Sequence, residues 1–308
     1  MKKEMTRKTK RIIFYTIAIA LPIIQFCIFY IGINMNSFII AFQKYEYSNV
    51  GYGYQVSFAG FSNFAEAIKL LGKNLYMIKN SFVLFVLTMV LSYPLALIFS
   101  FYIYKGYACS TLFKLFLYMP QIVSGLIFGY IFKIMVDGSV YFKVMEFFGV
   151  HQELGLLSNP STRLGTVYFY NIWVGFGVNV MMFSNNMSGI DKSIVESAEL
   201  DGATKVKEFW YITIPQVWGT LSSFIVISIS GIFTNSMALL ALVGDNGWDI
   251  ASLGYYMYQK TLVAQEVALG NELSFSGLSA LSLILTAILV PVVFTARHLF
   301  KKYGFSEN

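Results

Sequence analysis

The side chains that most often carry catalysis or bind metal ions are scarce in this chain. Its 308 residues include two histidines, His151 and His298, and two cysteines, Cys27 and Cys109. The histidines lie far apart, and two cysteines in or beside apolar runs make neither a metal site nor a disulfide framework. The sequence also has no glycine-rich phosphate-binding loop of the P-loop type. We therefore expect no catalytic site, no metal ion, no cofactor and no ATP-binding site in this chain.

Neutral polar and aromatic residues instead interrupt two long apolar runs. They are Asn171, Trp173, Gly175, Gly177 and Asn179 in one run, and Thr234, Asn235 and Ser236 in the other. Aromatic rings with amide and hydroxyl groups suit a neutral sugar, whose C–H faces stack on rings while its hydroxyls form hydrogen bonds. The competing interpretation is that the small and amide residues only pack helices against one another. The sequence leaves both interpretations open.

A charged segment, ESAELDGATKVKEFWYITIP at residues 196–215, lies between two apolar runs. Upstream of it, Ser188 followed by Asp191 predicts a helix start of the capping-box kind. Apolar residues then recur at helical spacing, and the charged residues face elsewhere. Gly202 is expected to end this helix, because glycine adopts a positive φ at little cost.

A second short helix is expected directly after that turn. Thr204 can cap it, with Phe209 and Ile212 as its apolar anchors. Pro215 stands at the start of the next apolar run, where a proline in the first turn is tolerated. The segment is therefore predicted to be a helix–turn–helix at the ends of two spans, with an exposed face suited to docking. An ordinary polar loop is the alternative.

The composition predicts a polytopic membrane protein of the all-α class. The chain is 56% hydrophobic and 12% charged, with a mean hydropathy of +0.63, whereas a soluble domain has roughly 25% charged residues. Six apolar runs are long enough to span about 30 Å of hydrocarbon. Their approximate bounds are 12–33, 78–104, 110–136, 166–187, 217–243 and 274–296. The first is too long for the apolar core of a signal peptide, so we expect it to be retained.

The basic residues predict how these spans are oriented. Most of the 22 Lys and Arg residues fall on the side of the N-terminus: at the chain start, in the turn after residue 104, near residues 192–207 and in the tail. Cytoplasmic loops are enriched in Lys and Arg, so both termini and the charged segment are expected in the cytoplasm. The formal charge of +6 is then explained by these loops, and no nucleic-acid partner is expected.

The charged segment closely resembles the EAA loop of ABC-importer permeases. The family pattern is Glu-Ala-Ala, two residues, Asp-Gly-Ala, and a closing hydrophobic-x-hydrophobic-Pro. The matching residues are Glu196, Ala198, Asp201, Gly202, Ala203, Phe209, Ile212, Ile214 and Pro215, with Ser197 in place of the first alanine. The Asp-Gly-Ala form resembles the carbohydrate-importer branch, and with it the maltose-transporter-like family.

The resemblance implies a type I ABC-importer transmembrane fold. Six transmembrane helices would form a single permease domain, residues 1–308, with a cytoplasmic EAA coupling loop at residues 188–215. The chain would be a multi-pass subunit in the cytoplasmic membrane of a bacterium. Its partners would be a second permease subunit in a heterodimer, a cytoplasmic ATPase dimer and an extracellular solute-binding protein. ATP hydrolysis would belong to the ATPase. The coupling residues would be Glu196, Ala198, Asp201, Gly202 and Ala203.

Two further stretches resemble the segments that line the sugar site in that family. Counting back from Glu196, residues 172–175 align with a substrate-facing Trp-Leu-Gly, and residues 232–247 align with an Asn-rich segment. The resemblance implies that the sugar contacts Trp173, Val174, Gly175, Phe233, Asn235 and Ser236. Residues 244–248 depart from the Gly-Gly-Pro that the family has at this point.

Other functions are kept as alternatives. Within the family, the solute could be a polyol phosphate instead of a sugar. A secondary carrier would need ionisable residues near the membrane midplane or inverted repeats, and neither is found in the sequence. A membrane-embedded enzyme would need converging His, Asp or Cys residues, which are too scarce.

Overall fold

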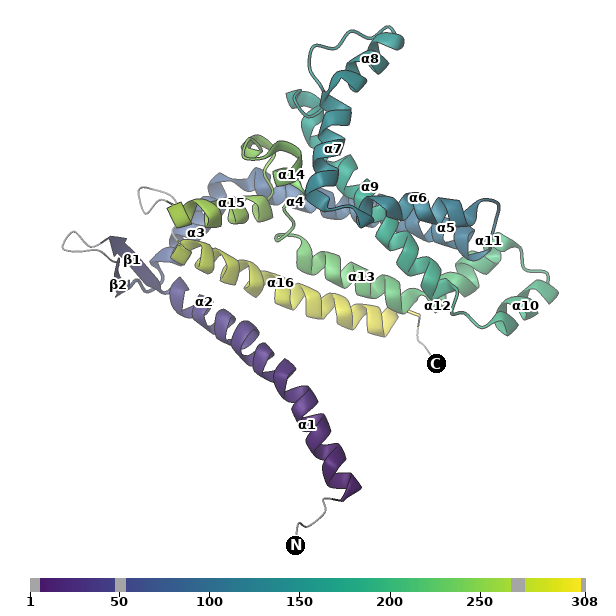
Figure 1. Cartoon of the computed structure of the whole chain (residues 1–308), viewed down its shortest axis with the longest axis horizontal. Coiled ribbons are helices and arrows are strands. Elements are labelled where there is room, and N and C mark those ends of the chain that lie inside the picture. Colours follow the sequence, from purple (N-terminus) through teal and green to yellow (C-terminus); the bar gives the residue numbers. More distant parts are fainter. Residues whose placement is uncertain (1–5, 48–53, 267–274, 306–308) are drawn as a thin grey trace. The chain divides into compact units, whose positions relative to one another are not determined.

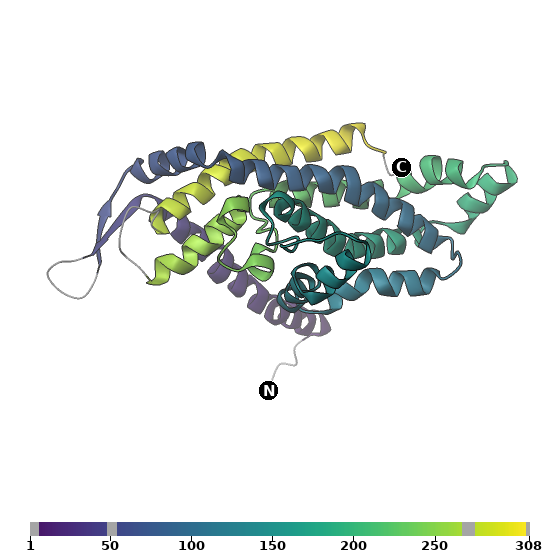
Figure 2. The same cartoon turned by 90° about the horizontal axis from the view of Figure 1, so that it is seen from above.

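The computed structural model describes residues 6–47, 54–266 and 275–305, and these are almost entirely helical (Figures 1 and 2). The helices are α1 (Arg7–Gln25), α2 (Ile33–Ala41), α3 (Ser62–Lys73), α4 (Leu75–Leu87), α5 (Tyr93–Tyr104), α6 (Ser110–Ile122), α7 (Gly125–Asp137), α8 (Ser139–Phe147), α9 (Pro160–Met187), α10 (Lys192–Leu200), α11 (Lys205–Glu208), α12 (Ile214–Gln216), α13 (Trp218–Gly231), α14 (Leu239–Val243), α15 (Leu253–Glu266) and α16 (Phe275–Tyr303). The strands β1 (Gln43–Tyr47) and β2 (Tyr54–Phe58) form one antiparallel hairpin, which the all-α prediction did not include.

Several of these helices join into longer ones. Three π-helical segments, Phe26–Gly32, Thr88–Ser92 and Phe209–Thr213, connect α1 to α2, α4 to α5 and α11 to α12. Four helices in the described residues are long and apolar enough to cross a membrane: Arg7–Ala41, Leu75–Tyr104, Gly125–Phe147 and Phe275–Tyr303. A fifth is added if Lys205–Gln216 and Trp218–Gly231, bent by 65° at their junction, count as one span. The protein is therefore a helical membrane protein with four to five candidate spans.

Two predicted spans are interrupted in the structure. The run at 110–136 is not one helix, because α6 ends at Ile122 and the backbone is extended at Val123 before α7 begins at Gly125. The prediction that 217–243 forms one helix is also wrong, because α13 ends at Gly231 and the short α14 begins only at Leu239. Apolar runs look the same whether the helix continues or breaks, so the hydropathy pattern could not reveal these interruptions.

The chain divides into two compact units. One comprises Met1–Leu70 with Val263–Leu285, and the other comprises Leu71–Leu262 with Thr286–Asn308. Residue 274, the start of the last predicted span, lies outside the described residues, as do Lys2 and Lys3 among the basic residues at the chain start.

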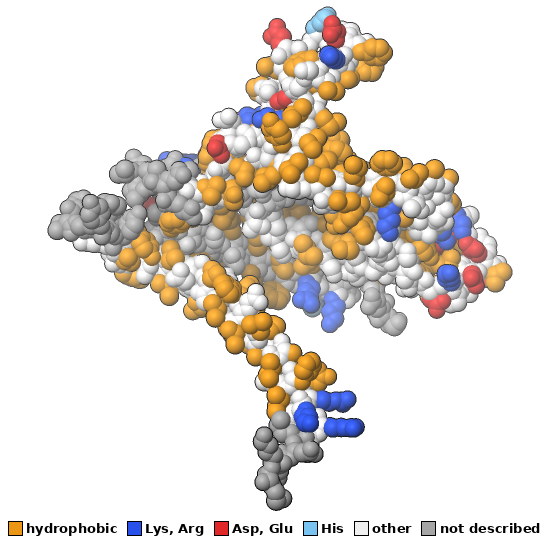
Figure 3. Space-filling model, in the orientation of Figure 1, with side chains coloured by type: hydrophobic (Ala, Val, Ile, Leu, Met, Phe, Trp, Pro, Cys, Tyr) orange, Lys and Arg blue, Asp and Glu red, His pale blue; other side chains and the backbone are white. Residues whose placement is uncertain are grey.

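In the first unit, hydrophobic side chains cover α1, and none of its residues is buried (Figure 3). At the other end of this long helix, Asn63 of α3 is buried and donates hydrogen bonds to the carbonyl oxygens of Ala41 and Gln43, at 2.8 and 2.9 Å. The rings of Phe42 and Phe64 pack 5.0 Å apart beside it. Asn63 is therefore a structural residue that joins the start of α3 to the end of α2.

In the second unit, α5 and α9 pack closely against each other, as Figures 1 and 2 show. Ser100 of α5 donates a buried hydrogen bond to the carbonyl oxygen of Val180, at 2.9 Å. The Tyr93 hydroxyl lies 2.6 Å from Ser228 Oγ and so joins α5 to α13. The buried cluster around these contacts comprises Tyr93, Ala96, Leu97, Val180, Phe183, Met187, Phe209, Ile214, Val217 and Leu221. Its last four members follow Gly202, so the apolar core holds the end of the charged loop.

Candidate functional site

The first candidate site is the 188–215 loop, which lies at one end of α5, α6 and α9 (Figure 1). Its first helix does not begin as the Ser188–Asp191 pattern predicts. Ser188 ends α9, and its backbone N–H donates to Ser184. Asp191 is the N-cap of α10, since its carboxylate accepts from the Ser193 N–H at 2.9 Å. The predicted cap residue was wrong because Ser188 is instead the C-cap of the preceding helix.

The turn after α10 is a Schellman motif, as the prediction for Gly202 requires. Gly202 has φ +78°. Its N–H donates to the Glu199 carbonyl oxygen at 3.1 Å, and the next N–H, of Ala203, donates to Ala198 at 2.9 Å. These two bonds satisfy helix-end carbonyls that would otherwise lack partners. The positive φ at Gly202 is confirmed.

The second helix of the loop also begins where expected. The Thr204 hydroxyl accepts from the Lys207 N–H at 3.4 Å and caps α11. Phe209 is buried, as predicted, but Ile212 is only half-buried. A π-helical turn at Phe209–Thr213 shifts the inward face, so that Thr213 and Ile214 are buried instead. A strict 3.6-residue period could not anticipate this shift.

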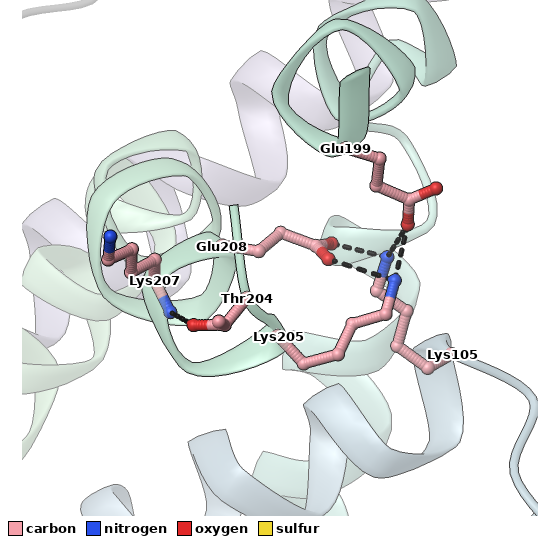
Figure 4. Close-up of polar contacts among 6 residues, drawn as sticks. All are labelled: Lys105, Glu199, Thr204, Lys205, Lys207 and Glu208. Atoms are coloured by element: carbon pink, nitrogen blue, oxygen red, sulfur yellow. Dashed lines mark hydrogen bonds and ion pairs between the residues drawn. The ribbon is translucent and has the colours of Figure 1, made fainter. Parts of the chain in front are cut away.

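Four charged side chains meet where the loop contacts the end of α5, and we call them the charge cluster. They are Lys105, Glu199, Lys205 and Glu208. Figure 4 shows both carboxylates pointing at the two lysine nitrogens. Glu208 is only 1% exposed and pairs with Lys105 and, at 3.4 Å, with Lys205. Glu199 pairs with Lys205 and lies 3.9 Å from Lys105 Nζ. Of the four, Lys105 alone comes from outside the loop, from the end of α5.

The pKa values of Glu199 and Lys205, the two more exposed members of the charge cluster, are shifted by their contact with each other. The hydrogen bond from Lys205 lowers the pKa of Glu199, and the same bond raises the pKa of Lys205. Because the pKa of Glu199 is lowered, the pair stabilises the loop above the ordinary glutamate pKa and is lost as the pH falls through the lowered value. Because the pKa of Lys205 is raised, the pair persists until the pH rises through that raised value. The loop is therefore charge-paired throughout the neutral range.

The outer face of the loop is open. Glu196, Asp201 and Gly202 are exposed, and Ala198 and Ala203 are half-buried beneath them. Leu200, 89% exposed, stands beside these charges at the end of α10. The five predicted coupling residues thus lie together on α10 and its turn. Their exposed charges and the apolar Leu200 form a surface that another protein can contact.

The second candidate site is an open cavity of about 580 Å³ in the second unit. Its polar lining residues are Gln121, Ser124, Tyr170, Asn171, Ser236 and Tyr258. Its other lining residues are Gly125, Leu126, Val174, Gly175, Ala238, Leu240 and Ala241. Among the residues that the structure describes, no charged side chain lines the cavity. A cavity of this size is in the usual range for small-molecule sites.

Both interrupted spans open onto this cavity. Ser124 and Gly125 lie at the α6–α7 break, and Ser236 and Ala238 lie in the segment between α13 and α14. Inside a membrane, irregular backbone is tolerated where it is buried in protein or lines a cavity. Broken helices also form the solute sites of many transporters. The breaks that the hydropathy pattern missed are therefore where a solute could be bound.

The segment between α13 and α14 has an unusual backbone that two asparagines hold. Met237 and Ala238 have φ of +55° and +52°, which non-glycine residues rarely adopt. The Met237 N–H donates to the Asn235 side chain at 2.7 Å, and its carbonyl oxygen accepts from the Asn171 side chain at 2.8 Å. Strain of this kind gathers at functional sites and persists only where neighbours hold it.

The structure brings three of the six predicted sugar-site residues to the cavity. Val174, Gly175 and Ser236 line it. Trp173 is not among the lining residues; its ring lies 5.3, 6.0 and 6.2 Å from the rings of three phenylalanines, Phe128, Phe132 and Phe169. Phe233 and Asn235 do not line the cavity either. The side-chain oxygen of Asn235 accepts a hydrogen bond from the Met237 N–H.

Four polar lining residues were not predicted: Gln121, Ser124, Tyr170 and Tyr258. Gln121 donates to the Val174 carbonyl oxygen at 2.6 Å and so joins the end of α6 to the middle of α9. The available signal was a Pro-Gln pair followed by Ser-Gly inside an apolar run, at residues 120–125. Proline and a serine–glycine pair within such a run are typical of a helix break.

Comparisons with known proteins agree with this architecture. A family model described as "Binding-protein-dependent transport system inner membrane component" matches residues 15–303. The multiple sugar-binding transport system permease protein MsmF of Streptococcus mutans is 24% identical over 269 residues, which cover 84% of this chain and 88% of MsmF. The arabinooligosaccharides transport system permease protein AraP of Bacillus subtilis is 24% identical over 276 residues, 87% of this chain and 84% of AraP.

The fold is that of a solved transporter subunit. A chain in the crystal structure of a bacterial ABC transporter involved in the import of the acidic polysaccharide alginate superposes with a TM-score of 0.76 at 18% identity, covering 96% of this chain and 98% of that chain. Since the family model matches nearly the whole chain, this protein belongs to the family of inner-membrane components of binding-protein-dependent transport systems.

Proposed function

We propose that this chain is the permease subunit of an ATP-driven importer that carries a neutral sugar or oligosaccharide across the cytoplasmic membrane of a bacterium. The observation that supports this most directly is the uncharged cavity where two spans break. Its hydroxyl and amide groups match the hydroxyls of a sugar, and its apolar walls match the C–H faces. The similar permeases MsmF and AraP are named for multiple sugars and arabinooligosaccharides.

The proposal includes six spans within one permease domain, residues 1–308. They are α1 with α2, α4 with α5, α6 with α7, α9, α13 with α14, and α16. α9 falls outside the apolar candidates because Asn171, Asn179 and other polar residues lower its hydropathy. A helix with its polar residues toward a cavity and toward its neighbours can still cross the membrane. Six spans leave both termini and the 188–215 loop in the cytoplasm, as the basic residues predict.

In this arrangement the 188–215 loop docks onto a cytoplasmic ATPase dimer through Glu196, Ala198, Asp201, Gly202 and Ala203. The ATPase hydrolyses ATP, and the loop passes its movement to α9 and α13, which it joins. An extracellular binding protein delivers the sugar, and a second permease completes the path as a heterodimer. One of the solved alginate transporter structures is in complex with a periplasmic protein bound to an alginate pentasaccharide, which supports the role of a binding protein.

The cavity favours a neutral solute over the polyol phosphate alternative. A phosphate dianion in an apolar pocket needs full positive charges to replace its water, and the starts of α7 and α14 at the cavity carry only partial charge. The lining residues within the described parts of the chain include no Arg or Lys. The described lining residues also include no Asp or Glu. A proton-coupled carrier binds its protons on such residues, so the cavity disfavours that function.

The test uses the importer purified through a tag on this chain and reconstituted in vesicles with ATP. Uptake of neutral oligosaccharides is compared with uptake of uronic-acid oligosaccharides and polyol phosphates, with ATP turnover measured in the same preparation. We expect uptake of a neutral sugar. Preferred uptake of a charged solute, or uptake that continues without ATP, would contradict the proposal.

Variants of the cavity sharpen this test. Losing one hydrogen bond to a buried sugar hydroxyl costs about 1–3 kcal/mol, so Ser236→Val should raise the KM for uptake about tenfold while ATPase association persists. Trp173→Ala and Asn235→Ala should also depress uptake, through the packing and the backbone that they support. Ser223→Val, the same change near the start of α13, is the control, because among the described residues Ser223 donates only to Gly219 of its own helix. Equal effects at the two serines would place the sugar elsewhere.

A further inference from the structure

Glu208 is a buried acid that the proposed docking surface does not use. Its side chain is 1% exposed, whereas Glu196 and Asp201 are exposed on the outer face of the loop. A carboxylate removed from water is unfavourable unless cations replace the lost hydration. Lys205, from the same short helix, provides one cation at 3.4 Å, and Lys105 provides the other. One of the two cations that offset the burial of Glu208 therefore comes from a different part of the chain.

Lys105 is held in place for this contact. It follows the last residue of α5, and Gly106, with φ +65°, ends the helix directly after it. Its ammonium group lies 5.7 and 5.3 Å from the ring centres of Phe101 and Tyr104, within the range of cation–π contacts. The lysine side chain is 13% exposed. It therefore loses little further conformational freedom when it pairs with Glu208.

The same lysine approaches α10. Lys105 Nζ lies 3.9 Å from Glu199, and Lys205 bridges Glu199 and Glu208 (Figure 4). Next to the charges, the rings of Phe101 and Phe209 pack 5.2 Å apart. The end of α5 thus contacts both helices of the loop through charges and through an apolar pair. Packed contacts resist continuous deformation, so movement of one side displaces the other.

From this geometry we propose that Lys105 is a positioning residue for coupling: its ion pair with Glu208 makes the end of α5 move with the 188–215 loop. ATPase movement then reaches three membrane helices, α9 and α13 through the chain itself and α5 through Lys105. α5 packs along α9, which lines the cavity. The inference rests on the proposed function, because it assumes that an ATPase moves the loop.

The first test removes the charge of Lys105 and keeps most of the length of its apolar stem. In the reconstituted importer, Lys105→Met should lower the sugar taken up per ATP hydrolysed about tenfold, a usual size for coupling between sites. ATPase association should persist, because the outer face of α10 is unchanged. Lys105→Arg keeps the charge and should restore coupling. Lys207→Met is the control, since Lys207 is exposed on the same loop and has no ion pair among those that the structure describes.

A second measurement leaves the ion pair intact. Spin labels at Tyr107→Cys, in the exposed turn after α5, and at Lys192→Cys, on exposed α10, report the distance between turn and loop. Cys27 and Cys109 are replaced by serine. The distance should stay the same with and without ATP. If it changes with ATP, or if an assembled Lys105→Met importer couples normally, the inference is wrong.

The outcome for Glu196→Lys separates this inference from the proposed function. If Glu196→Lys weakens ATPase association while Lys105→Met changes nothing, only the role of Lys105 is rejected. If ATPase association is unchanged both in Glu196→Lys and when the exposed side chains of α10 are truncated to alanine, the proposed docking surface is wrong. Lys105 then has no movement to transmit.

Discussion

At the residue scale, the turn of the 188–215 loop depends on a backbone conformation that few side chains tolerate. Gly202 has φ +78°, and no atom lies within 4 Å of the place where its Cβ would be. A larger residue would therefore meet no neighbour there, and its cost would come from the backbone alone. Glycine is needed here for its conformational freedom and not for its small size.

This leads to a prediction about Gly202. Gly202→Val should cost about 1–3 kcal/mol of local strain, because a β-branched residue disfavours positive φ. The Schellman turn should loosen and less ATPase should co-purify with the chain, while the spans still insert. Gly202→Asn is the matched control, since asparagine adopts this conformation more readily. Normal ATPase association and transport in the valine variant would show that the turn has no part in docking.

At the element scale, two glycines in α9 have different roles although they lie two residues apart. A Cβ at Gly177 would lie 1.9 Å from the Leu117 carbonyl oxygen of α6, so this glycine allows the two helices to approach closely. A Cβ at Gly175 would meet nothing within 4 Å, and this residue lines the cavity. The packing interpretation therefore holds for Gly177, while Gly175 is free to face a solute.

The two glycines give a matched pair of variants. Gly177→Ala should destabilise the protein by about 1–3 kcal/mol, because α6 and α9 must move apart. Its melting temperature should fall, with uptake falling in proportion to the loss of folded protein. Gly175→Ala should fold normally and change the KM for sugar by narrowing the cavity. Thermal unfolding and uptake, measured on both, check this; a destabilised Gly175→Ala with an unaffected Gly177→Ala would reverse the assignment.

At the scale of the whole molecule, much apolar surface is exposed among the residues that the structure describes. None of the residues of α1 is buried, and Leu21, Phe14 and Ile17 are 73%, 67% and 69% exposed. Surfaces of this kind contact lipid or another protein. The exposed face of α10, which is polar and charged, suits a cytoplasmic partner instead.

We therefore expect the chain to be stable only in its assembly. Expression with a second permease and the ATPase should yield a core with one copy of this chain, measured by native mass spectrometry. Expressed alone, the chain should aggregate or be degraded, since its partner-facing apolar surface stays uncovered. Recovery of a lone monomer that transports sugar without ATP would contradict both this expectation and the proposed function.

The amino-acid sequence by itself determined the features that depend on local chemistry. The positive φ of Gly202, the Thr204 cap and the helical membrane class follow from neighbouring residues and composition, because backbone preferences and hydropathy act over short distances. The match of the EAA pattern, spread along one continuous segment, likewise needed no tertiary information.

Only the tertiary structure decided which residues meet. Whether an apolar run continues or breaks depends on what can satisfy its free backbone groups, as Asn171 and Asn235 do for Met237. Gly175 and Gly177 are the same residue in the same helix, and their roles differ because one faces α6 and the other faces the cavity. The pairing of Lys105 with Glu208 joins segments far apart in the chain. A charge cannot reveal its partner until folding has brought the two together.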